Sequence, residues 1–289
     1  MHNNLIILAG GASSRMKQPA SATQLNTEEE LQANQRTKGL IGIGSEKRPL
    51  LDFLLNNAKK AGYKNIYFIV SKNNILFREF YGEKDRDNDF NGLLISYAVQ
   101  HIPEGRDKPY GTADALWQCL KQYPELIEES FSVCNSDNIY SVRALEAMRM
   151  LYDPNGFVSY DRDSLEFSMQ KISRFALARL NEKNYLVDII EKPDYTAVEK
   201  YRGKDGKLRV SMNLFKFTGN YIFPFVRDCP VNIQRNEKEL QTAILNMLEK
   251  NPGTVKGVDI AEHVPDLTTK DDITIIKEYI LKHYDSLQW

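Results

Sequence analysis

The sequence predicts an α/β protein whose central sheet is mostly parallel and carries helices on both faces. Short apolar runs alternate with amphipathic segments along the first half of the chain, and these runs are almost continuously apolar. Such runs are typical of parallel strands that are buried on both sides. In the second half, turn clusters such as residues 181–184 separate strand-like segments, which predicts antiparallel strands added to the same sheet.

The elements of the first half can be placed from apolar spacing and from residues that start or stop helices. Between residues 49 and 62 the apolar side chains share one helical face, with Pro49 at the start and Gly62 at the end. The strands predicted in this half are 5–9, 66–70, 93–100 and 131–135, and the predicted helices are 49–62, 74–81, 113–123 and 143–152.

The second half is expected to carry the antiparallel strands and two further helices. Strands are predicted at 157–160, 174–180, 185–190, 209–217 and 254–258, and helices at 237–250 and 272–284. Neither an internal repeat nor a linker divides the chain. We therefore expect a single domain over residues 1–289.

Residues 18–37 stand apart from this alternation, because they are polar and show no apolar periodicity. Their glutamine, asparagine, threonine and glutamate content is typical of a mobile surface loop. The segment follows a glycine-rich turn directly. That position leaves two interpretations open, a lid over an active site and a passive insertion.

The composition is that of an ordinary globular enzyme, with 42% hydrophobic and 27% charged residues among 289. A formal net charge of −1 gives no reason to expect nucleic acid or an anionic membrane as a partner.

The apolar stretch at 5–9 is too short for a signal peptide or a membrane span, so we expect a cytoplasmic protein. Three cysteines without a CxxC pair indicate reduced, buried thiols, and Cys134 is expected to serve packing. The sequence is compatible with a homo-oligomer and does not fix the oligomeric state.

The first candidate site is the turn after the first predicted strand. Gly10 and Gly11 are followed by Ser13, Ser14 and Arg15. Glycines let backbone N–H groups approach a phosphate, and an arginine can offer two donors to phosphate oxygens. The order matches neither the P-loop pattern nor the dinucleotide-binding fingerprint. A purely structural turn is the alternative, since strand-to-loop turns use glycine in any case.

Acidic residues form the second candidate site. Asp137 comes just after strand 131–135, at the edge where open α/β sheets bind ligands. A carboxylate there suits Mg²⁺, which takes one or two carboxylates plus phosphate oxygens. Asp266 offers a second carboxylate. The alternatives are structural, because Asp137 could form a turn or a helix cap and the cluster near Asp266 could cap the last helix.

Polar residues at two later strands form the third candidate site. Glu191, Lys192 and Pro193 follow strand 185–190, and Asn213 lies within strand 209–217. Lys192 is a candidate for contact with an acceptor phosphate, and Glu191 and Asn213 for contact with hydroxyl groups. The alternative for Glu191 and Lys192 is a solvated strand end before a helix that Pro193 starts.

Taken in order, these residues resemble the sugar-phosphate nucleotidylyltransferase family over residues 5–272. That family has a Gly-Gly…Arg…Lys signature, a glutamine-bearing strand, a glycine-led helix, a metal aspartate, Glu-Lys-Pro and a late aspartate. The matching residues here are Gly10, Gly11, Arg15, Lys38, Gln100, Gly111, Thr112, Asp137, Glu191, Lys192, Asn213 and Asp266. Two segments, 16–37 and 101–110, are longer than the family usually has, which bears on the assignment of Lys38 and on base specificity.

The resemblance implies a Rossmann-like nucleotidyltransferase fold with antiparallel additions on the acceptor side. It implies a nucleotide-binding part at about 1–140 and an acceptor-binding part at about 141–289. The implied partners are a nucleoside triphosphate (NTP) and a small phosphorylated acceptor. The residues implied to contact the nucleotide are Gly10, Gly11, Gln100, Gly111 and Thr112, with Arg15 and Lys38 on its phosphates.

The remaining site residues are assigned by the same resemblance. Asp137 and Asp266 are implied to hold Mg²⁺. Lys192 is implied to bind the acceptor phosphate, and Glu191 with Asn213 the sugar. The catalytic set implied in this way consists of Arg15, Lys38 and Lys192.

The implied reaction transfers a nucleoside monophosphate to a sugar 1-phosphate and releases pyrophosphate. An ionised acceptor phosphate is already a nucleophile, so alignment and positive charge suffice for catalysis. Residues 8–16 are also similar to molybdenum-cofactor guanylyltransferases, so a non-sugar phosphate such as that cofactor or phosphocholine is the second interpretation. A non-catalytic sensor is the third, and a retained Asp137–Asp266 pair with Lys192 argues against it. Because the chain shows no hexapeptide-repeat acyltransferase domain, we expect one activity.

Overall fold

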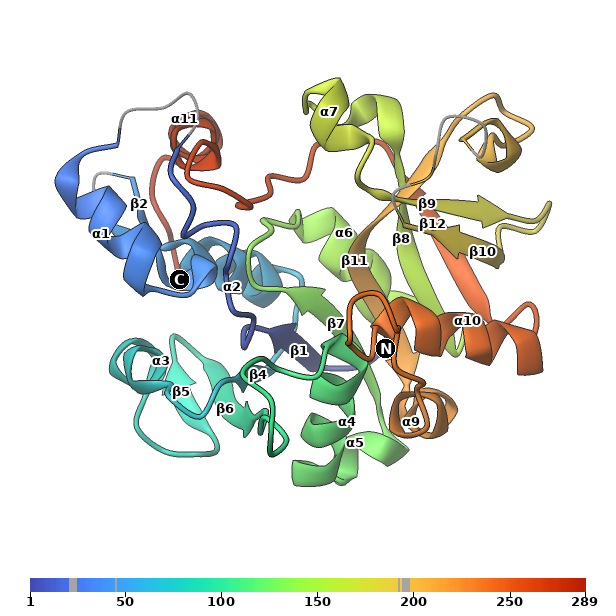
Figure 1. Cartoon of the computed structure of the whole chain (residues 1–289), viewed down its shortest axis with the longest axis horizontal. Helices are drawn as coiled ribbons and strands as arrows, with labels where there is room; N and C mark the ends of the chain where they lie inside the picture. Colours follow the sequence, from blue (N-terminus) through green and yellow to red (C-terminus); the bar gives the residue numbers. More distant parts are fainter. Residues whose placement is uncertain (21–24, 45, 192, 194–197) are drawn as a thin grey trace.

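One mixed sheet forms the centre of the computed structural model, which describes residues 1–20, 25–44, 46–191, 193 and 198–289. Within these residues the sheet has ten strands (Figure 1). Eight of them follow the order β10 (Leu186–Ile190), β9 (Ala176–Leu180), β11 (Arg209–Thr218), β7 (Ser130–Asn135), β1 (Asn4–Leu8), β4 (Asn65–Val70), β6 (Leu93–Val99) and β5 (Asn88–Phe90). In addition, β8 (Asn155–Asp161) pairs with β11, and β12 (Val255–Ile260) pairs with β8.

The parallel centre of the sheet consists of β7, β1, β4 and β6. Successive side chains of β1 point to opposite faces, as the pleat requires. Leu5 and Ile7 enter one hydrophobic core and Ile6 enters the other, and all three are fully buried. Burial on both faces explains why the first-half strands are almost continuously apolar in sequence.

The second half adds antiparallel strands, as the sequence predicts. β11 pairs antiparallel with β7, β8 and β9, and β9 pairs antiparallel with β10. The register between β11 and β8 is interrupted between Ser211 and Phe215. Asn213 lies in this interruption with φ of 59°, so the bulge changes the direction of its side chain relative to the regular pleat.

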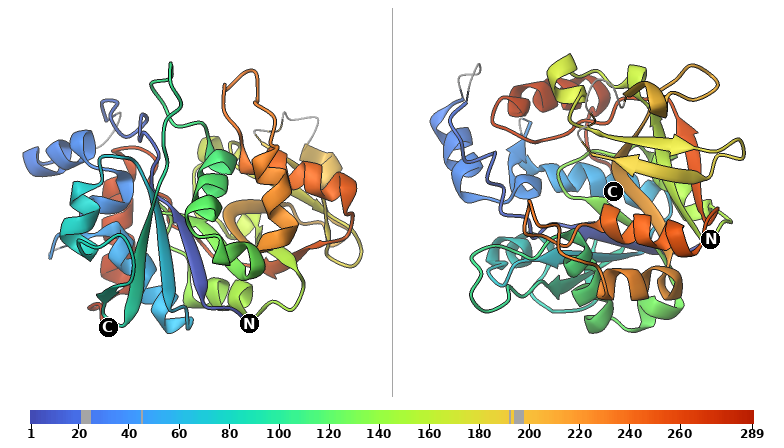
Figure 2. Two further views of the ribbon diagram at one scale, coloured as in Figure 1. Left: turned by 90° about the horizontal axis from the view of Figure 1, so that it is seen from below. Right: turned by 45° about the vertical axis from the view of Figure 1, so that its right-hand side comes forward.

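Helices cover both faces of the sheet (Figure 2). One layer contains α2 (Leu50–Lys60), α3 (Ile75–Tyr81) and α6 (Val142–Met150), whose apolar residues join the core of Leu5 and Ile7. The other contains α4 (Thr112–Gln122), α5 (Glu125–Glu128), α9 (Gly219–Arg227) and α10 (Leu240–Lys250), which pack on the side of Ile6. The fold class predicted from the sequence is therefore confirmed.

Shorter elements surround these layers. α11 (Asp272–His283) packs with α1 (Thr27–Gln35) and the start of α2 in a third, smaller apolar cluster. The other short elements are η1 (Lys38–Leu40), β2 (Gly42–Ile43), β3 (Arg48–Pro49), η2 (Arg162–Ser164), α7 (Met169–Ile172) and η3 (Glu199–Tyr201).

Each strand and helix expected from the sequence has a counterpart. α9 is among the elements that were not expected. Gly219 at its first position and Pro224 in its interior are both poor helix formers. The burial of Ile222 and Val226 against the α4–α10 layer outweighs that propensity. A Cβ on Gly219 would lie 2.1 Å from the carbonyl oxygen of Leu126, so this close approach requires glycine.

The prediction of a loop over 18–37 is wrong for residues 27–35, which form α1. The helix begins with a capping box: the side chain of Asn26 accepts from the backbone of Glu29, and the Glu29 carboxylate accepts from the backbone of Asn26. Its buried Gln32 accepts a 2.8 Å hydrogen bond from the Gly42 N–H. Lys277 of α11 forms an ion pair with Glu29. α1 therefore has no apolar stripe, and these polar contacts together with the buried Ala33 hold it against the rest of the protein.

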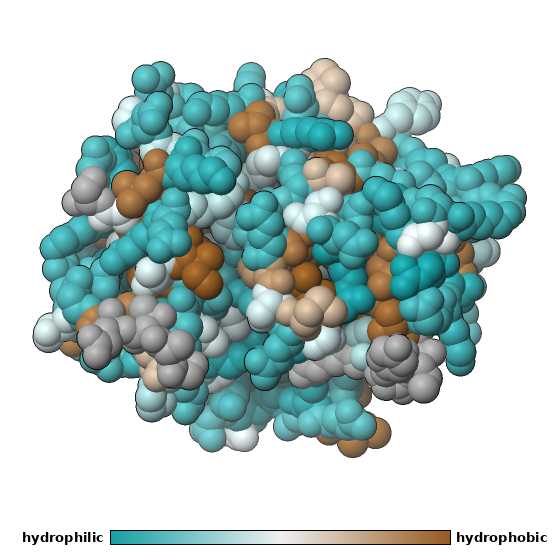
Figure 3. Space-filling model, turned by 90° about the horizontal axis from the view of Figure 1, so that it is seen from above, coloured by the Kyte–Doolittle hydropathy of each residue, from teal (hydrophilic) through white to brown (hydrophobic). Residues whose placement is uncertain are grey.

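The face seen from the side of α7 and α11 is mostly hydrophilic, and its hydrophobic residues form small separate groups (Figure 3). Among the described residues, no helix combines the length and the apolar character that a membrane span needs. The three cysteines are buried free thiols, as expected, and burial raises the pKa of Cys134 well above its usual range. Cys134 therefore contributes to packing.

His2 is a buried polar residue close to the central strand. Its side chain is 8% exposed, and Nε2 lies 3.3 Å from the hydroxyl of Ser132. Burial, together with the nearby charge of Lys216, lowers the pKa of His2 to about 3. The folded protein therefore keeps this imidazole neutral at a pH where the unfolded chain protonates it.

We predict that His2 makes the folded state sensitive to acid. Between about pH 6.5 and 4.5 the unfolded chain binds one proton more at this position, so the free energy of unfolding falls by up to ~1.4 kcal/mol per pH unit of acidification. Replacement of His2→Gln should reduce that slope by a similar amount. Urea unfolding across this pH range measures how the free energy of unfolding depends on pH. Equal slopes against pH in the wild type and the variant would contradict the prediction.

Candidate functional site

Two adjoining cavities open at the carboxyl ends of the parallel strands, where open α/β sheets bind ligands. Their volumes are ≈ 390 Å³ and ≈ 1120 Å³. The smaller is lined by residues at the ends of β1, β4, β6 and β7 and in the loops after them. The larger is lined by residues near β9, β10 and β11 and by residues of 266–272. The residues that line both are Arg15, Asn135, Asp137 and Glu237.

The turn after β1 forms one wall of the smaller cavity. A Cβ on Gly10 would lie 3.4 Å from the backbone of Val70, whereas a Cβ on Gly11 would meet nothing within 4 Å. Packing therefore does not require glycine at position 11, which borders open space. Met16 is fully buried and anchors the end of the turn, so the exposed Arg15 before it is held between the two cavities.

Gln100 and Gly111 also line the smaller cavity. Gly111 has φ of 102°, and a Cβ there would lie 2.3 Å from the carbonyl oxygen of Lys238. Both observations explain why glycine starts α4. The hydroxyl of Thr112 accepts a 2.9 Å hydrogen bond from the Leu240 N–H, so this side chain also joins α4 to α10.

Lys38 and Asp137 form an ion pair with 2.7 Å between Nζ and Oδ2. Their side chains are 11% and 19% exposed. Lys38 begins η1, whose last carbonyl, that of Leu40, accepts a hydrogen bond from Arg36 just after α1. Although 22 residues separate Arg15 and Lys38 in sequence, both side chains line the smaller cavity.

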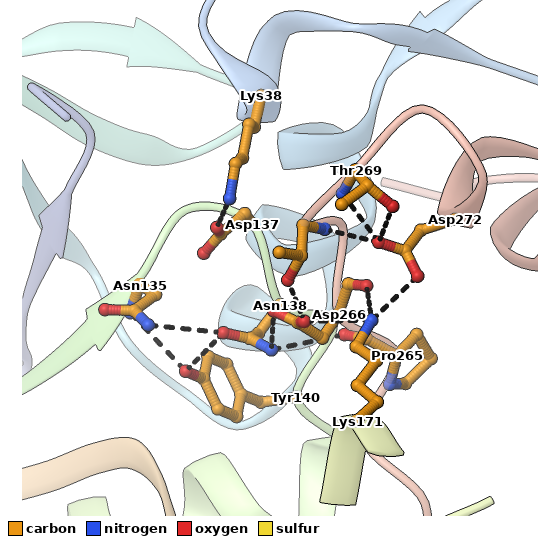
Figure 4. A network of polar contacts seen from close by, with 11 residues as sticks. Lys38, Asn135, Asp137, Asn138, Tyr140, Lys171, Pro265, Asp266, Thr269 and Asp272 are labelled. Atoms are coloured by element: carbon orange, nitrogen blue, oxygen red, sulfur yellow. Dashed lines mark hydrogen bonds and ion pairs between the residues drawn. The ribbon is translucent and has the colours of Figure 1, made fainter. Parts of the chain in front are cut away.

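Asp137 and Asp266 are brought together by backbone pairing (Figure 4). Asn138 forms an isolated antiparallel bridge with Asp266, and the Leu267 N–H donates to the Asp137 carbonyl at 2.8 Å. The Asn138 amide also donates to Asp266 Oδ1 at 3.2 Å. Both carboxylates therefore line the larger cavity.

Lys171 holds the segment that carries Asp266. Its Nζ lies 3.1 Å from Asp266 Oδ2, 2.9 Å from the Asp266 carbonyl oxygen and 2.8 Å from Asp272 Oδ1. Asp272 in turn accepts from the backbone N–H groups of Thr268 and Thr269 at 2.9 and 2.7 Å. One lysine and one carboxylate thus fix the backbone at Asp266, the predicted metal residue, and just after it (Figure 4).

A buried tyrosine contacts the same region. The hydroxyl of Tyr140 donates to the Met212 carbonyl at 2.6 Å and lies 3.3 Å from the side-chain oxygen of Asn138. Burial raises the pKa of Tyr140 well above its usual range, so the phenol remains a neutral donor. It links the end of β7 to the bulge in β11.

Glu191 and Asn213, which were predicted to contact the sugar, line the larger cavity. Glu191 forms an ion pair with Arg235, which also pairs with Glu239. The Asn213 side-chain oxygen accepts from Gln241 at 3.1 Å. Lys192, predicted to bind the acceptor phosphate, lies outside the described residues.

Several residues that complete the site were not found from the sequence. Lys171, Arg235 and Asn138 contact predicted residues directly, and Asp272 contacts Lys171. Of these, Asn138 stood beside Asp137 and Asp272 stood in the acidic cluster after Asp266, so a local signal existed. Lys171 and Arg235 had none, because their partners are distant in sequence.

The two carboxylates fit a hard divalent cation. Asp137 and Asp266 offer oxygen ligands, and Asn135 and Asn138 line the same cavity. In the described part of the chain, no group of three or more His, Cys, Asp or Glu side chains could hold a metal ion. An ion here would therefore take further ligands from water and phosphate oxygens, which is the coordination that Mg²⁺ prefers.

Comparison with known proteins identifies the family. The model of the nucleotidyl transferase family matches residues 4–256. The chain belongs to this family. This result confirms the resemblance on which the site prediction rests.

Relatives with similar sequences are glucose-1-phosphate adenylyltransferases. The enzyme of Rhizobium radiobacter is 25% identical over 228 residues, which cover 76% of this chain and 49% of that protein. Glucose-1-phosphate adenylyltransferase 1 of Vibrio vulnificus (strain CMCP6) is 28% identical over 225 residues, which cover 75% of this chain and 48% of that protein. The chain thus spans about half the length of these relatives.

A solved structure gives independent support for the fold. UDP-glucose pyrophosphorylase complexed with UDP-glucose matches with a TM-score of 0.70 over 98% of this chain and 99% of that chain. The sequence identity is 13%. At this identity the similarity establishes the fold alone.

We predict that Lys171→Met destabilises the domain by about 2–4 kcal/mol, because it leaves two carboxylates of low exposure without their cation. The matched control is Lys204→Met, since Lys204 and Glu182 form a pair whose side chains are 84% and 77% exposed. That change should cost less than ~1 kcal/mol. Urea unfolding of both variants measures the difference. Equal losses of unfolding free energy in the two variants would show that the Lys171 contacts stabilise the protein no more than an exposed ion pair does.

Proposed function

We propose that the protein transfers a nucleoside monophosphate from an NTP to a sugar 1-phosphate and releases pyrophosphate. The observation that carries the proposal is the meeting of the two cavities at Arg15 and Asp137, which line both. A nucleotide in the smaller cavity and an acceptor in the larger one would face each other across these two side chains. The names of the relatives support an acceptor of the glucose 1-phosphate type.

The proposed reaction needs alignment and positive charge rather than a general base. An oxygen of the acceptor phosphate attacks the α-phosphorus of the NTP and forms a new P–O bond. The bond between the α-phosphorus and the bridging oxygen breaks, and pyrophosphate leaves with its electrons. The acceptor phosphate has a second pKa of about 6, so its oxygen is already ionised near neutral pH.

Positive charge in the site would offset the charge that develops during transfer. Arg15 is exposed at the junction of the cavities and forms no ion pair within the described ranges, so its guanidinium can bind phosphate oxygens. Lys38 is proposed to assist it. We propose Mg²⁺ as the cofactor, held by Asp137 and Asp266, where it would supply further charge to the phosphates.

The acceptor is proposed to lie in the larger cavity. Glu191 and Asn213 line it and offer acceptors for sugar hydroxyls, while Lys192 is proposed to bind the acceptor phosphate. On the nucleotide side, Gly10, Gly11 and Gln100 line the smaller cavity. The division into a nucleotide part at about 1–140 and an acceptor part at about 141–289 belongs to the same proposal, as does a cytoplasmic location.

The proposal predicts that Asp137→Asn loses activity. A panel of the four common NTPs against several sugar 1-phosphates and phosphocholine, read by pyrophosphate release with Mg²⁺, should give turnover with at least one sugar 1-phosphate. The variant should fall by about 100-fold or more in kcat, because it loses a charged ligand for the metal. The matched control Asp163→Asn changes an exposed aspartate outside both cavities and should stay near wild type.

Three outcomes of that panel would contradict parts of the proposal. Normal turnover of Asp137→Asn would show that Asp137 is not a required metal ligand. Turnover with phosphocholine alone would reassign the acceptor. Tight NTP binding without turnover on any acceptor would indicate a sensor in place of an enzyme.

A second prediction concerns the acceptor alone. Lys192→Met should raise the KM for the sugar 1-phosphate by about tenfold or more while the KM for the NTP changes little, because one charge-assisted contact is lost. Lys200→Met is the control, since Lys200 is exposed and lines neither cavity. Steady-state kinetics with each substrate varied in turn gives both constants. If the KM for the NTP rises instead, Lys192 contacts the nucleotide rather than the acceptor.

A further inference from the structure

Two glutamine amides converge on one buried carboxylate beside the smaller cavity. Asp114 Oδ2 accepts from Gln100 Nε2 at 2.9 Å and from Gln118 Nε2 at 2.9 Å. Asp114 is 3% exposed and Gln100 is 5% exposed. Gln118 is itself fixed by a reciprocal pair of hydrogen bonds with the backbone of His101, at 2.8 and 3.0 Å. The carboxylate is therefore held in place from outside the cavity.

This arrangement determines which end of the Gln100 amide is available to a ligand. A carboxylate accepts hydrogen bonds and cannot donate, so the NH₂ group of Gln100 must face Asp114. The same NH₂ group donates to the Gly111 carbonyl at 3.0 Å, which occupies its second hydrogen. The carbonyl oxygen Oε1 is left on the side of Gly10, 3.6 Å from the position that a Cβ on Gly10 would take. Gly10 and Gln100 both line the smaller cavity.

The position of Asp114 in its helix suggests a simpler role, which the contacts do not support. Asp114 is the third residue of α4, where a carboxylate favours the positive end of the helix and often caps free N–H groups. No side chain caps the start of α4, however, and Asp114 directs Oδ2 to the two glutamines instead. Its hydrogen-bonding capacity therefore serves Gln100.

We infer that Asp114 is a positioning residue that sets base specificity. This inference rests on the proposed function, in which Gln100 recognises the base of the NTP. By fixing the Gln100 amide, Asp114 makes the cavity present a hydrogen-bond acceptor, so that the bound base is recognised through an N–H donor on its edge. A base that offers only an acceptor at that point leaves Oε1 without a partner and is rejected.

Asp114→Leu tests this inference, because leucine has a similar volume and no acceptor. Only the Gly111 carbonyl then favours one orientation of the Gln100 amide, so the flipped orientation becomes accessible. We expect the ratio of kcat/KM between the preferred and the next NTP to fall about tenfold, while the acceptor KM stays unchanged. Asp114→Asn keeps the shape and the fold, and a neutral amide no longer enforces one orientation. We expect Asp114→Asn to lower the same kcat/KM ratio by a smaller factor.

The matched control is Asp52→Asn. Asp52 is also the third residue of its helix, α2, is 6% exposed and accepts from the Tyr81 hydroxyl at 2.8 Å, but it lines neither cavity. This variant should lose stability without a change in NTP preference. Thermal melting of each protein separates the two effects.

Equilibrium binding of each NTP keeps this test separate from the proposed function. If the wild type binds NTPs selectively without turnover, the proposed reaction fails, and the ratios of dissociation constants still decide the role of Asp114. The inference is overturned if folded Asp114→Leu or Asp114→Asn keeps the wild-type preference, or if the wild type binds all four NTPs equally. It is also overturned if Asp52→Asn lowers the selectivity ratio between NTPs as much as the Asp114 variants do.

Discussion

The candidate site depends on a short antiparallel contact between two segments that are 128 residues apart in the chain. Asn138 pairs with Asp266, and the Leu267 N–H donates to the Asp137 carbonyl. Backbone hydrogen bonds fix neighbouring residues more tightly than flexible side chains can. The end of β7 supplies one carboxylate and the approach to α11 supplies the other, so the pair exists only when the sheet and the last helix are both in place.

Two carboxylates at one cavity would repel each other without compensating charge, and each has a lysine from a different element. At 11–20% side-chain exposure these pairs are screened less than surface pairs. The lysines are not equivalent. Lys171 contacts Asp272 and the Asp266 backbone as well as the Asp266 carboxylate, whereas Lys38 contacts only Asp137 within the residues described. Lys171 is therefore suited to hold the segment, whereas Lys38 has one carboxylate partner, which the proposed function would replace by a phosphate.

Local sequence signals identified the central strands and the polar residues that follow them, several of which line the two cavities. Strands such as β1 are recognisable because burial on both faces makes them apolar throughout. The contacts of Lys171 could not be predicted, since it meets Asp266 across 95 residues and no periodicity records such a pairing. The failure at α1 is different. Asn26 and Glu29 form a capping box that is visible in sequence, but the absence of an apolar stripe outweighed it.

In the proposed reaction, the loop at 230–239 would join the two cavities into one site. Its Lys238 carbonyl accepts from the Ala113 N–H at the start of α4, and the Lys238 N–H donates to the Tyr110 carbonyl. Three residues earlier, Arg235 pairs with Glu191 on the acceptor side. Glu237 between them lines both cavities. Transfer between two bound reactants loses rate steeply when their separation changes by about 1 Å. A loop that contacts the wall of each cavity sets that separation, and the glycine at 111 is what permits its close approach.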